Sequence, residues 1–579
     1  MVQSQDPPTF RYTVDWENGT NATTCGSSVD TPCIDVASVI RSFDLALGIN
    51  GTDRTKVWFE VALVPGTYNG TGNLDNNLFG YANITFISTS SSSSLGVIFD
   101  AQVQGRPFKL VEPTALPVPY TNTTVTTVSF RGITFTNGQV SNTTLSYASG
   151  ADRNVGGGGA FMMYVNNTGA NVVFDTCTFH NNSARSTSAG HGGALRTGSG
   201  VPYQAPSNAS LALLNCVFTD NSATVSGGAV HVESAVTTVT NGAFSRNHAS
   251  NGSGGAIFII ADSAFVSNSN FVDNRAIMYG GAISLNSEYE TTSQVATSNF
   301  STNQAGFGGA LAATNAYVNV TLSLFNLNNA MVSGGAVSVS NMGYFESVQS
   351  NFTKNNCVDG KGGAVRIEGD CEFYIHDSTL FQSNTANEGA CISFSHSNGK
   401  INNTQFIDCN AYDDGGAIFT EFGIFSIANA VITNSSAQNG GAVYCSASKI
   451  DFYENVEIYD NVDIGSDSAS DEPSGPGEII PNSFNIYCGI DPPYTYCNFT
   501  GMDPFISMCG EPYIKEKQAL TKGQLAGIIV GVILGAGVIA FGIGILITKT
   551  TIKSYFVPLI RSTNNGGEED DEEEEDHHR

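Results

Sequence analysis

The sequence predicts an all-β fold: a parallel β-helix followed by one transmembrane helix and an acidic tail. Three observations lead to this prediction. A motif returns about every 27 residues between 158 and 460, which is typical of solenoid proteins. Residues 525–547 form one uncharged apolar segment, and residues 568–576 are all acidic.

The repeat combines a Gly-Gly-Ala triplet with a preceding FxxN motif. The triplets begin at Gly158, Gly192, Gly227, Gly254, Gly280, Gly308, Gly334, Gly362, Gly415 and Gly440, with a degenerate copy (EGA) at Glu388. FxxN or a close variant starts at Phe179, Phe218, Phe244, Phe271, Phe300, Phe325, Phe352 and Phe381. After each triplet, apolar and polar residues alternate, which predicts a short half-buried strand. Each unit is therefore expected to form one coil.

Each motif residue has an expected structural role. Paired glycines permit positive φ and close approach of stacked backbones. Alanine fits a crowded inward position, and the phenylalanines of successive coils are expected to stack in the core. Asparagine tolerates left-handed backbone and can form a ladder of hydrogen bonds between coils. We therefore interpret the motif as a folding device and predict no catalytic role for it.

The repeated GGA[IVL] and FxxN motifs resemble the repeat of chlamydial polymorphic outer membrane proteins and, more widely, pectin-lyase-like right-handed β-helices. VPGTYNG (64–70) and FRGITFTNG (130–138) resemble the opening coils of protist surface β-helix proteins. The resemblance covers about half of the chain and implies a right-handed β-helix, surface display and adhesion.

Six segments are predicted. They are an N-terminal cap (1–60), opening coils (61–157), the repeat β-helix (158–460), a cysteine-containing juxtamembrane cap and linker (461–524), the transmembrane helix (525–547) and an acidic cytosolic tail (548–579).

The apolar segment is long enough to span a bilayer as one helix. Gly527, Gly531 and Gly535 share one face of it and permit a homodimer through close helix pairing. The first residues, MVQSQDPPTF, contain no apolar signal sequence. We favour a type I plasma-membrane protein whose signal peptide is not visible in this chain. The alternative is a tail-anchored scaffold with its repeats in the cytosol.

Glycosylation signals and cysteines favour the extracellular orientation. The N-x-S/T sequons are at Asn18, Asn21, Asn50, Asn69, Asn83, Asn122, Asn142, Asn166, Asn181, Asn208, Asn251, Asn299, Asn319, Asn351, Asn402, Asn434 and Asn498. All 12 cysteines precede the apolar segment, an even number that suits an oxidising compartment. The disulfide candidates are Cys25 with Cys33, Cys177 with Cys216 across one coil step, and Cys488, Cys497 and Cys509. Two stacked thiols are the alternative for Cys177 and Cys216.

Composition excludes several function classes. The net charge of −28 opposes binding to nucleic acid and other polyanions. Two tryptophans give little sign of a large sugar-stacking platform. No zinc-protease, P-loop or nucleophile-elbow motif occurs, so we expect no cofactor, no metal site and no catalytic residue.

The enzyme alternative comes from the resemblance, because galacturonan hydrolases of that fold use clustered aspartates, a Gly-His-Gly and a basic triplet. Gly190-His191-Gly192, Asp413-Asp414 and Arg366-Ile367-Glu368 resemble these features. However, about eight coils, or nearly 40 Å, separate the histidine from the aspartate pair. Paired carboxylates of glycosidases lie about 5–10 Å apart, so we predict no enzyme activity.

On the outward strand positions, His231, Glu233, Arg366, Glu368, Glu421 and Tyr444 stand among Ser, Thr and Asn. This pattern predicts either a face that binds an extended glycan or a partner protein, or a solvated wall partly covered by sugar. The insertion Thr197–Ser210 is expected to protrude as a binding loop. We predict a surface protein that recognises a glycan or protein ligand. A polysaccharide-active enzyme and a receptor that signals through its acidic tail are the alternatives.

Overall fold

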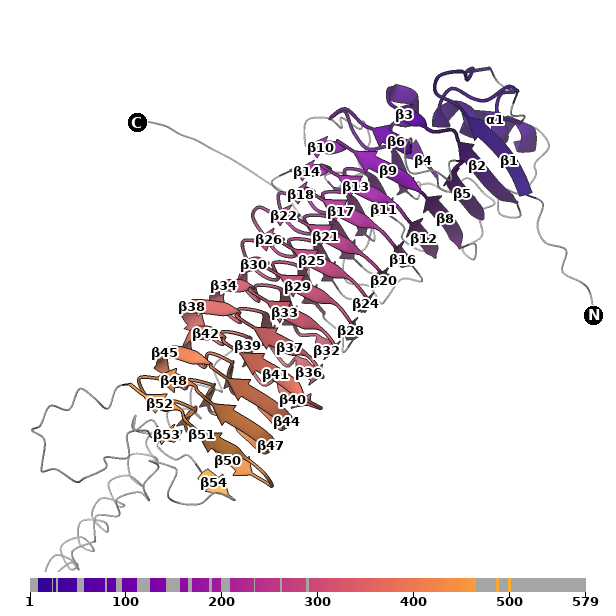
Figure 1. Ribbon diagram of the computed structural model, residues 1–579. Helices are drawn as coiled ribbons and strands as arrows, with labels where there is room; N and C mark the ends of the chain where they lie inside the picture. The colour runs from indigo at the N-terminus through magenta and orange to yellow at the C-terminus, as the bar shows by residue number, and fades with distance from the viewer. Residues whose placement is uncertain are drawn as a thin grey trace, which may run out of the picture. The chain divides into compact units, whose positions relative to one another are not determined.

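The computed structural model describes residues 9–22, 24–27, 30–48, 57–78, 81–89, 96–111, 125–141, 157–164, 169–186, 190–198, 209–233, 235–260, 263–287, 291–464, 486–488 and 498–500. They all belong to one compact unit, Met1–Cys509. This unit is a parallel β-solenoid, as predicted, whose strands form three sheets along a stack of coils (Figure 1).

The predicted transmembrane segment, with Gly527, Gly531 and Gly535, and the predicted acidic tail lie outside the described residues. Within the ranges given above, no helix is long and apolar enough to cross a membrane.

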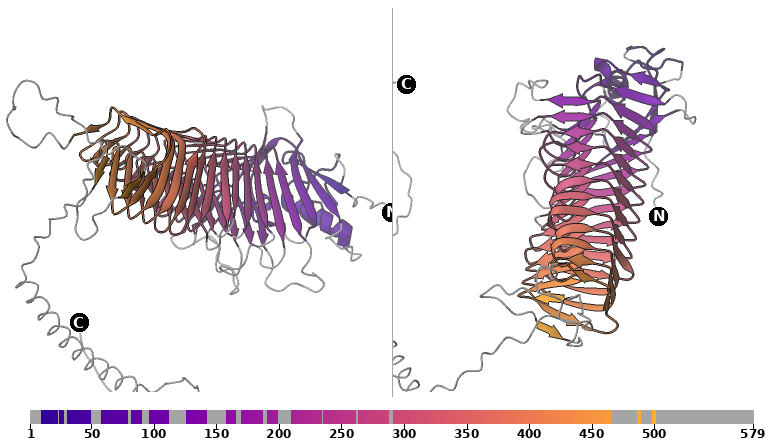
Figure 2. Two further views of the ribbon diagram at one scale, coloured as in Figure 1. Left: turned by 90° about the horizontal axis from the view of Figure 1, so that it is seen from below. Right: turned by 60° about the vertical axis from the view of Figure 1, so that its left-hand side comes forward.

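One coil of the repeat contains four short strands. In the coil that starts at Val236, β20 (Val236–Thr240) and β21 (Ala243–Ser245) belong to a 28-stranded sheet. β22 (His248–Ala249) belongs to a 12-stranded sheet, and β23 (Ile257–Ile260) to a 14-stranded sheet. Each strand pairs in parallel with its equivalent one coil away, for example β23 with β19 and β27. Figure 2 shows the coils stacked in one column.

The 14-stranded sheet contains β4 (Asn76–Asn77), β7 (Phe108–Val111), β11 (Phe161–Tyr164), β15 (Leu195–Gly198), β19 (Val230–Glu233), β23, β27 (Ile283–Asn286), β31 (Leu311–Thr314), β35 (Val337–Ser340), β39 (Val365–Glu368), β43 (Ile392–Ser395), β46 (Ile418–Glu421), β49 (Val443–Ser446) and β53 (Ile486–Cys488). The 12-stranded sheet contains β10 (Gln139–Ser141), β14 (Ser183–Arg185), β18 (Ser222–Ala223), β22, β26 (Arg275–Ala276), β30 (Gln304–Phe307), β34 (Asn329–Ser333), β38 (Asn356–Lys361), β42 (Thr385–Glu388), β45 (Asn410–Asp414), β48 (Ser436–Ala437) and β52 (Val462–Asp463).

The 28-stranded sheet receives two strands from most coils. They are β1 (Thr9–Val14), β2 (Trp58–Leu63), β3 (Gly66–Tyr68), β5 (Asn83–Ser88), β6 (Val97–Asp100), β8 (Thr126–Arg131), β9 (Ile133–Thr136), β12 (Ala170–Asp175), β13 (Thr178–His180), β16 (Ser210–Leu214), β17 (Val217–Thr219), β20, β21, β24 (Ala264–Ser267), β25 (Asn270–Val272), β28 (Thr292–Ala296), β29 (Asn299–Ser301), β32 (Tyr317–Thr321), β33 (Leu324–Asn326), β36 (Tyr344–Val348), β37 (Asn351–Thr353), β40 (Glu372–His376), β41 (Thr379–Gln382), β44 (Asn398–Ile407), β47 (Ile424–Thr433), β50 (Lys449–Phe452), β51 (Glu457–Tyr459) and β54 (Asn498–Thr500). β1, β53 and β54 extend the stack into segments that the sequence assigned to caps.

The motif phenylalanines form one stack in the core, as predicted. It contains Phe135, Phe179, Phe218, Phe244, Phe271, Phe300, Phe325, Phe352, Phe381 and Phe406. The rings of Phe271 and Phe300 are nearly parallel, with centroids 4.8 Å apart. This separation equals the spacing of neighbouring strands, so the stack follows from the coil period.

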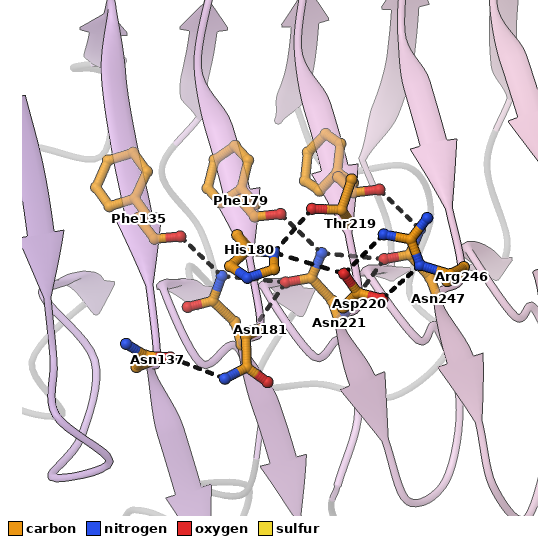
Figure 3. Close-up of polar contacts among 12 residues, drawn as sticks. Phe135, Asn137, Phe179, His180, Asn181, Thr219, Asp220, Asn221, Arg246 and Asn247 are labelled. Carbon is orange, nitrogen blue, oxygen red and sulfur yellow. Dashed lines mark hydrogen bonds and ion pairs between the residues drawn. The ribbon is translucent and has the colours of Figure 1, made fainter. Parts of the chain in front are cut away.

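The motif asparagines form the predicted ladder. The side-chain amide of Asn221 donates to the carbonyl oxygen of Phe179 at 3.0 Å and to Oδ1 of Asn247 at 3.0 Å (Figure 3). The ladder continues through successive coils to Asn384. One expectation was wrong: the left-handed residue is not this asparagine but the one before it, for example Asp220 with φ 57°. Positive φ there turns the chain from the 28-stranded into the 12-stranded sheet.

The paired glycines have the two predicted roles. Gly280 has φ 62°, which L side chains rarely adopt. A Cβ on Gly281 would overlap the carbonyl oxygen of Gly309 in the next coil. The first glycine therefore makes the turn, and the second allows two coils to approach at the corner.

In the coil with the degenerate triplet, the motif positions are taken by Gly389, Ala390 and Cys391. They lie one residue later than in the prediction, which began the triplet at Glu388. Val365 pairs with Ile392, so Gly389, with φ 59°, is the first motif glycine. Cys391 then replaces the inward alanine, and Cys409 replaces the ladder asparagine of the next coil. A disulfide joins these two residues. The repeat pattern of the sequence does not indicate this pair.

The other cysteines give a mixed result. The Cys25–Cys33 disulfide is confirmed. Cys488 is also disulfide-bonded, whereas Cys497 and Cys509 lie outside the described residues. Of the two alternatives for Cys177 and Cys216, the disulfide is wrong and the pair of reduced thiols is confirmed, because both are buried free thiols. Their Sγ atoms point to the backbone carbonyls of Phe130 and Phe174, at 3.4 and 3.3 Å.

One helix, α1 (Val36–Gly48), packs at the N-terminal end of the solenoid. Its side chain Phe43 stacks on Phe59 of β2 with ring centroids 3.8 Å apart. Asp35 caps it, accepting a hydrogen bond from the backbone N–H of Ser38 at 2.7 Å. A short 3-10 turn, η2 (Thr71–Asn73), follows later in the chain. The apolar spacing of residues 36–47 is typical of a helix, but no helix was predicted in this segment.

Candidate functional site

The outer face of the 14-stranded sheet carries the polar side chains that were expected to bind a ligand. Its first outward row contains Arg196, His231, Ser284, Ser338 and Arg366, which share one register. We expected these side chains to face solvent, and this expectation was wrong. They are buried; Arg366 is 5% exposed and His231 is 0% exposed. Ser226, the residue before the Gly227-Gly228 pair, covers His231, with Oγ 3.0 Å from Nδ1. The second outward row, with Glu233, Glu368 and Glu421, remains partly exposed.

Four side chains form a continuous hydrogen-bonded chain across two coils. His191 Nδ1 lies 2.7 Å from Ser226 Oγ, which lies 3.0 Å from His231 Nδ1. His231 Nε2 then lies 2.8 Å from Glu233 Oε1. The guanidinium of Arg196 lies 3.7 Å from the same carboxylate oxygen. We call these five residues the histidine cluster.

Burial and charge shift the ionisation of the histidine cluster. Burial lowers the pKa of His191 to about 3 and also lowers the pKa of His231. For Glu233, burial raises the pKa, but the hydrogen bond and charge of His231 and the charge of Arg196 outweigh it and lower the pKa to about 2. At neutral pH, both histidines are therefore neutral and the carboxylate is ionised.

The histidine cluster has the Ser-His-Glu order of a nucleophilic relay. However, Ser226 is 4% exposed. The nearby backbone N–H groups of Gly227 and Gly228 donate to Ser253 and Gly254 of the next coil, so they are not free to stabilise an oxyanion. In this geometry the cluster links two coils. It does place three ionisable side chains on adjacent outward positions, which the sequence alone did not reveal.

The other residues of the enzyme alternative lie apart, as predicted. Asp413 and Asp414 are on β45, eight coil steps from β15 of the histidine cluster. Asp414 accepts a hydrogen bond from Asn439 at 2.8 Å, and burial raises its pKa. Asp413 accepts one from Asn387. Each aspartate therefore joins neighbouring coils.

A cavity of about 320 Å³ opens above β39. We call it the β39 cavity. The ends of four successive strands, β30, β34, β38 and β42, form its wall, and Arg366 and Glu368 line its floor. It is lined by Phe307, Val332, Ser333, Asp359, Gly360, Lys361, Arg366, Glu368, Asn387 and Glu388.

An aromatic ladder continues from the cavity along the same outward row. Phe419 stacks on Tyr444 with centroids 5.2 Å apart, and Tyr444 stacks on Tyr487 at 5.5 Å. Lys361 Nζ lies 4.4 Å from the centre of the Phe419 ring. The sequence pattern singles out Tyr444 but does not reveal the ladder, because the equivalence of Phe419, Tyr444 and Tyr487 depends on coil register.

A second and larger cavity, of about 650 Å³, lies on the 28-stranded sheet. Short polar side chains and Leu322 and Leu324 line it, together with the sequon asparagines Asn299 and Asn351. A glycan on either asparagine would cover this cavity. The smaller β39 cavity has no sequon in its lining and is the better candidate for an external ligand.

The sequons of the described strands all lie on the 28-stranded sheet. They are Asn83 on β5, Asn299 on β29, Asn319 on β32, Asn351 on β37, Asn402 on β44 and Asn498 on β54. Asn181 and Asn434 lie in the turns that leave this sheet, and Asn251 lies in the turn before β23. None of the described strands of the 14-stranded sheet contains a sequon. Asn18, Asn21 and Asn69 lie near the N-terminal end, and Asn50, Asn122, Asn142, Asn166 and Asn208 fall outside the described residues.

The insertion at Thr197–Ser210 is described only at its two ends, Thr197–Gly198 and Ala209–Ser210. Its expected role as a protruding loop therefore stays a prediction.

Comparison with known proteins supports the repeat assignment. Residues 215–233 match the model of the Chlamydia polymorphic membrane protein repeat. This segment runs from the turn before β17 to the end of β19 and contains Phe218, Asn221 and the Gly227 triplet. No curated protein matches the chain. The chain is thus a parallel β-helix with repeats of this type.

Proposed function

We propose that this protein is displayed on a cell surface, as a single-pass type I membrane protein, and recognises a glycan or protein ligand. In this proposal the outer face of the 14-stranded sheet binds the ligand. The repeat match favours a surface or membrane protein. The observation that carries the proposal is that none of the described strands of this sheet contains a sequon.

N-linked glycans are bulky and prevent macromolecules from docking where they are attached. In the described strands, sequons occur on the 28-stranded sheet, whereas the aromatic ladder lies on the 14-stranded sheet and the β39 cavity lies between that sheet and the 12-stranded sheet. Aromatic side chains beside polar groups are typical of binding surfaces. A ligand that approaches the 14-stranded sheet would meet both features without an intervening glycan.

The proposal is tested by adding one glycan to each face. Ser446→Asn creates a sequon on β49, at an outward position of the 14-stranded sheet. Ser267→Asn creates a matched sequon on β24 of the 28-stranded sheet. Beads that carry each full-length glycosylated chain are tested for binding to cells and to glycan arrays. Ser446→Asn should abolish binding that Ser267→Asn retains; equal binding by both variants would contradict the proposal.

A polysaccharide-active enzyme is the second candidate, because the histidine cluster supplies a serine, two histidines and a carboxylate in one chain. Its test is release of reducing sugar from neutral and acidic polysaccharides by the wild-type chain and by Ser226→Ala. Turnover that disappears in Ser226→Ala would favour the enzyme over the recognition protein.

A further inference from the structure

We propose that the β39 cavity binds a neutral pyranose unit of a glycan. This inference rests on the proposed function and names the chemistry of its ligand. Four observations carry it: the local rebuilding of the cavity wall, the pairing of its charges, one hydroxyl without a partner, and an apolar side.

The wall of the cavity is a local departure from the repeat. β18, β22, β26 and β48 of the 12-stranded sheet have two residues each, whereas β30, β34, β38 and β42 have four to six. The register between these longer strands shifts at each step. Such irregularities re-aim side chains beside binding sites. Here they place Ser333, Lys361 and Glu388 around one space.

The charges in the cavity are paired within the protein. Lys361 Nζ lies 2.6 Å from Glu388, and Arg366 Nη2 lies 3.0 Å from Glu368. Arg366 also donates to Ser393 and Ser395 at 2.7 and 2.8 Å. The lining holds two cations and three carboxylates, since exposed Asp359 has no equivalent cation there. The cavity would therefore repel an anionic ligand, because its net charge is negative and both of its cations are already paired with carboxylates. A neutral ligand fits best.

Ser333 provides a hydroxyl without a partner. Its side chain is 6% exposed, and its Oγ has no hydrogen-bond partner among the residues described by the structure. Buried polar groups are normally hydrogen-bonded. A hydroxyl can donate and accept at once, which suits the hydroxyl groups of a sugar. The nearby carboxylates would accept further sugar O–H donors.

The remaining side of the cavity is apolar. Phe307 and Val332 line it, and Phe307 is held by stacking on Tyr279 with centroids 4.9 Å apart. A pyranose has both a ring of hydroxyls and an apolar C–H face, so it can satisfy both sides of this cavity. A volume of about 320 Å³ lies at the small end of ligand pockets, which suits one or two sugar units rather than a folded partner.

The test measures binding of D-glucose, D-galactose, D-mannose and N-acetylglucosamine to the full-length chain by saturation-transfer NMR and calorimetry. D-Glucuronate is the anionic comparison. At least one neutral sugar should bind, about tenfold more tightly than glucuronate. Ser333→Ala should weaken its binding about tenfold, and Ser333→Thr, which keeps the hydroxyl, should restore most of the affinity.

Ser347→Ala is the matched control. Ser347 is another buried serine on β36 whose Oγ has no partner among the described residues, but it does not line the cavity. It should bind sugar as the wild type does. The proposal is overturned if no neutral sugar binds, if glucuronate binds as tightly, or if Ser333→Ala and Ser347→Ala behave alike. If Ser446→Asn still blocks binding to cells in that case, the recognition face stands and its ligand is not a neutral sugar.

Discussion

The asparagine that ends each FxxN motif ties one coil to the next. Asn274 donates from Nδ2 to the Phe244 carbonyl and to Asn303, both at 3.0 Å. It also accepts from the backbone N–H of Asn247 at 3.1 Å. All these groups are buried, so a missing partner leaves them without water as a substitute. The motif is therefore sensitive to changes that preserve its size but not its hydrogen bonds.

Asn274→Ala should lower the free energy of unfolding by about 3 kcal/mol, because it leaves a buried N–H and a buried carbonyl without this partner. Asn286→Ala is the control, since Asn286 is exposed on β27. It should change stability by less than about 0.5 kcal/mol. Denaturant unfolding of the two variants measures the difference. Equal midpoints would show that the ladder adds nothing to stability.

The histidine cluster should make the protein acid-sensitive. The pKa of His191 falls from 6.5 to about 3 on folding, so between these pH values the unfolded chain binds a proton that the folded chain does not. Stability must then decrease as the pH falls through this window. The lowered pKa of Glu233 acts in the same direction below about pH 4.5.

His191→Gln should reduce the slope of unfolding free energy against pH by about one proton between pH 6 and pH 4. Asn286→Ala is the comparison, because it changes an exposed side chain that carries no ionisable group. Its slope should equal that of the wild type. An unchanged slope in His191→Gln would show that His191 is not neutral in the folded protein.

At the scale of one coil, the Cys391–Cys409 disulfide replaces two motif residues at once. Cys391 occupies the alanine position and Cys409 the asparagine position. Asn384, the last asparagine of the unbroken ladder, lies with Nδ2 3.3 Å from Cys391 Sγ. In the next coil, the disulfide therefore takes the place of the side-chain hydrogen bond that a ladder asparagine at position 409 would form.

Cys391→Ala should cost about 3 kcal/mol, the expected effect of opening a loop of this length. The double variant Cys391→Ala/Cys409→Asn restores the motif and should recover at least half of that loss. Unfolding with and without reductant measures both. If the double variant is as unstable as the single one, the disulfide and the ladder are not interchangeable.

Coil architecture was predictable because each motif residue has one physical role that does not depend on its neighbours. The Phe271 stack and the Gly280 turn follow from spacing and backbone sterics alone. The frame of the degenerate coil was not predictable, because Glu388-Gly389-Ala390 fits the pattern in two registers. The burial of His231 was not predictable either. It depends on Ser226, the residue before the Gly227-Gly228 pair, which lies outside the period-two pattern of the strand.

For the whole molecule, the site was less predictable than the fold. The sequence pattern singles out Arg366, Glu368 and Tyr444, but not Ser333, Lys361 or Phe419. Ser333 and Lys361 line one cavity with Arg366 because the strands that carry them shift register from coil to coil. A consequence concerns glycans: within the described strands of the repeat, sequons occur only on the 28-stranded sheet, so glycans attached to these strands would leave the 14-stranded sheet bare.

The most direct test of the account is site-resolved mapping of N-linked glycans on the protein from its native cells. We predict occupancy at Asn299, Asn319, Asn351, Asn402 and Asn434, where the 28-stranded sheet or its turns present the side chain at the surface. That result would place the repeats outside the cell, with glycans attached to the 28-stranded sheet and its turns. Intact protein without glycan at any of these sites would contradict surface display and favour a scaffold that faces the cytosol.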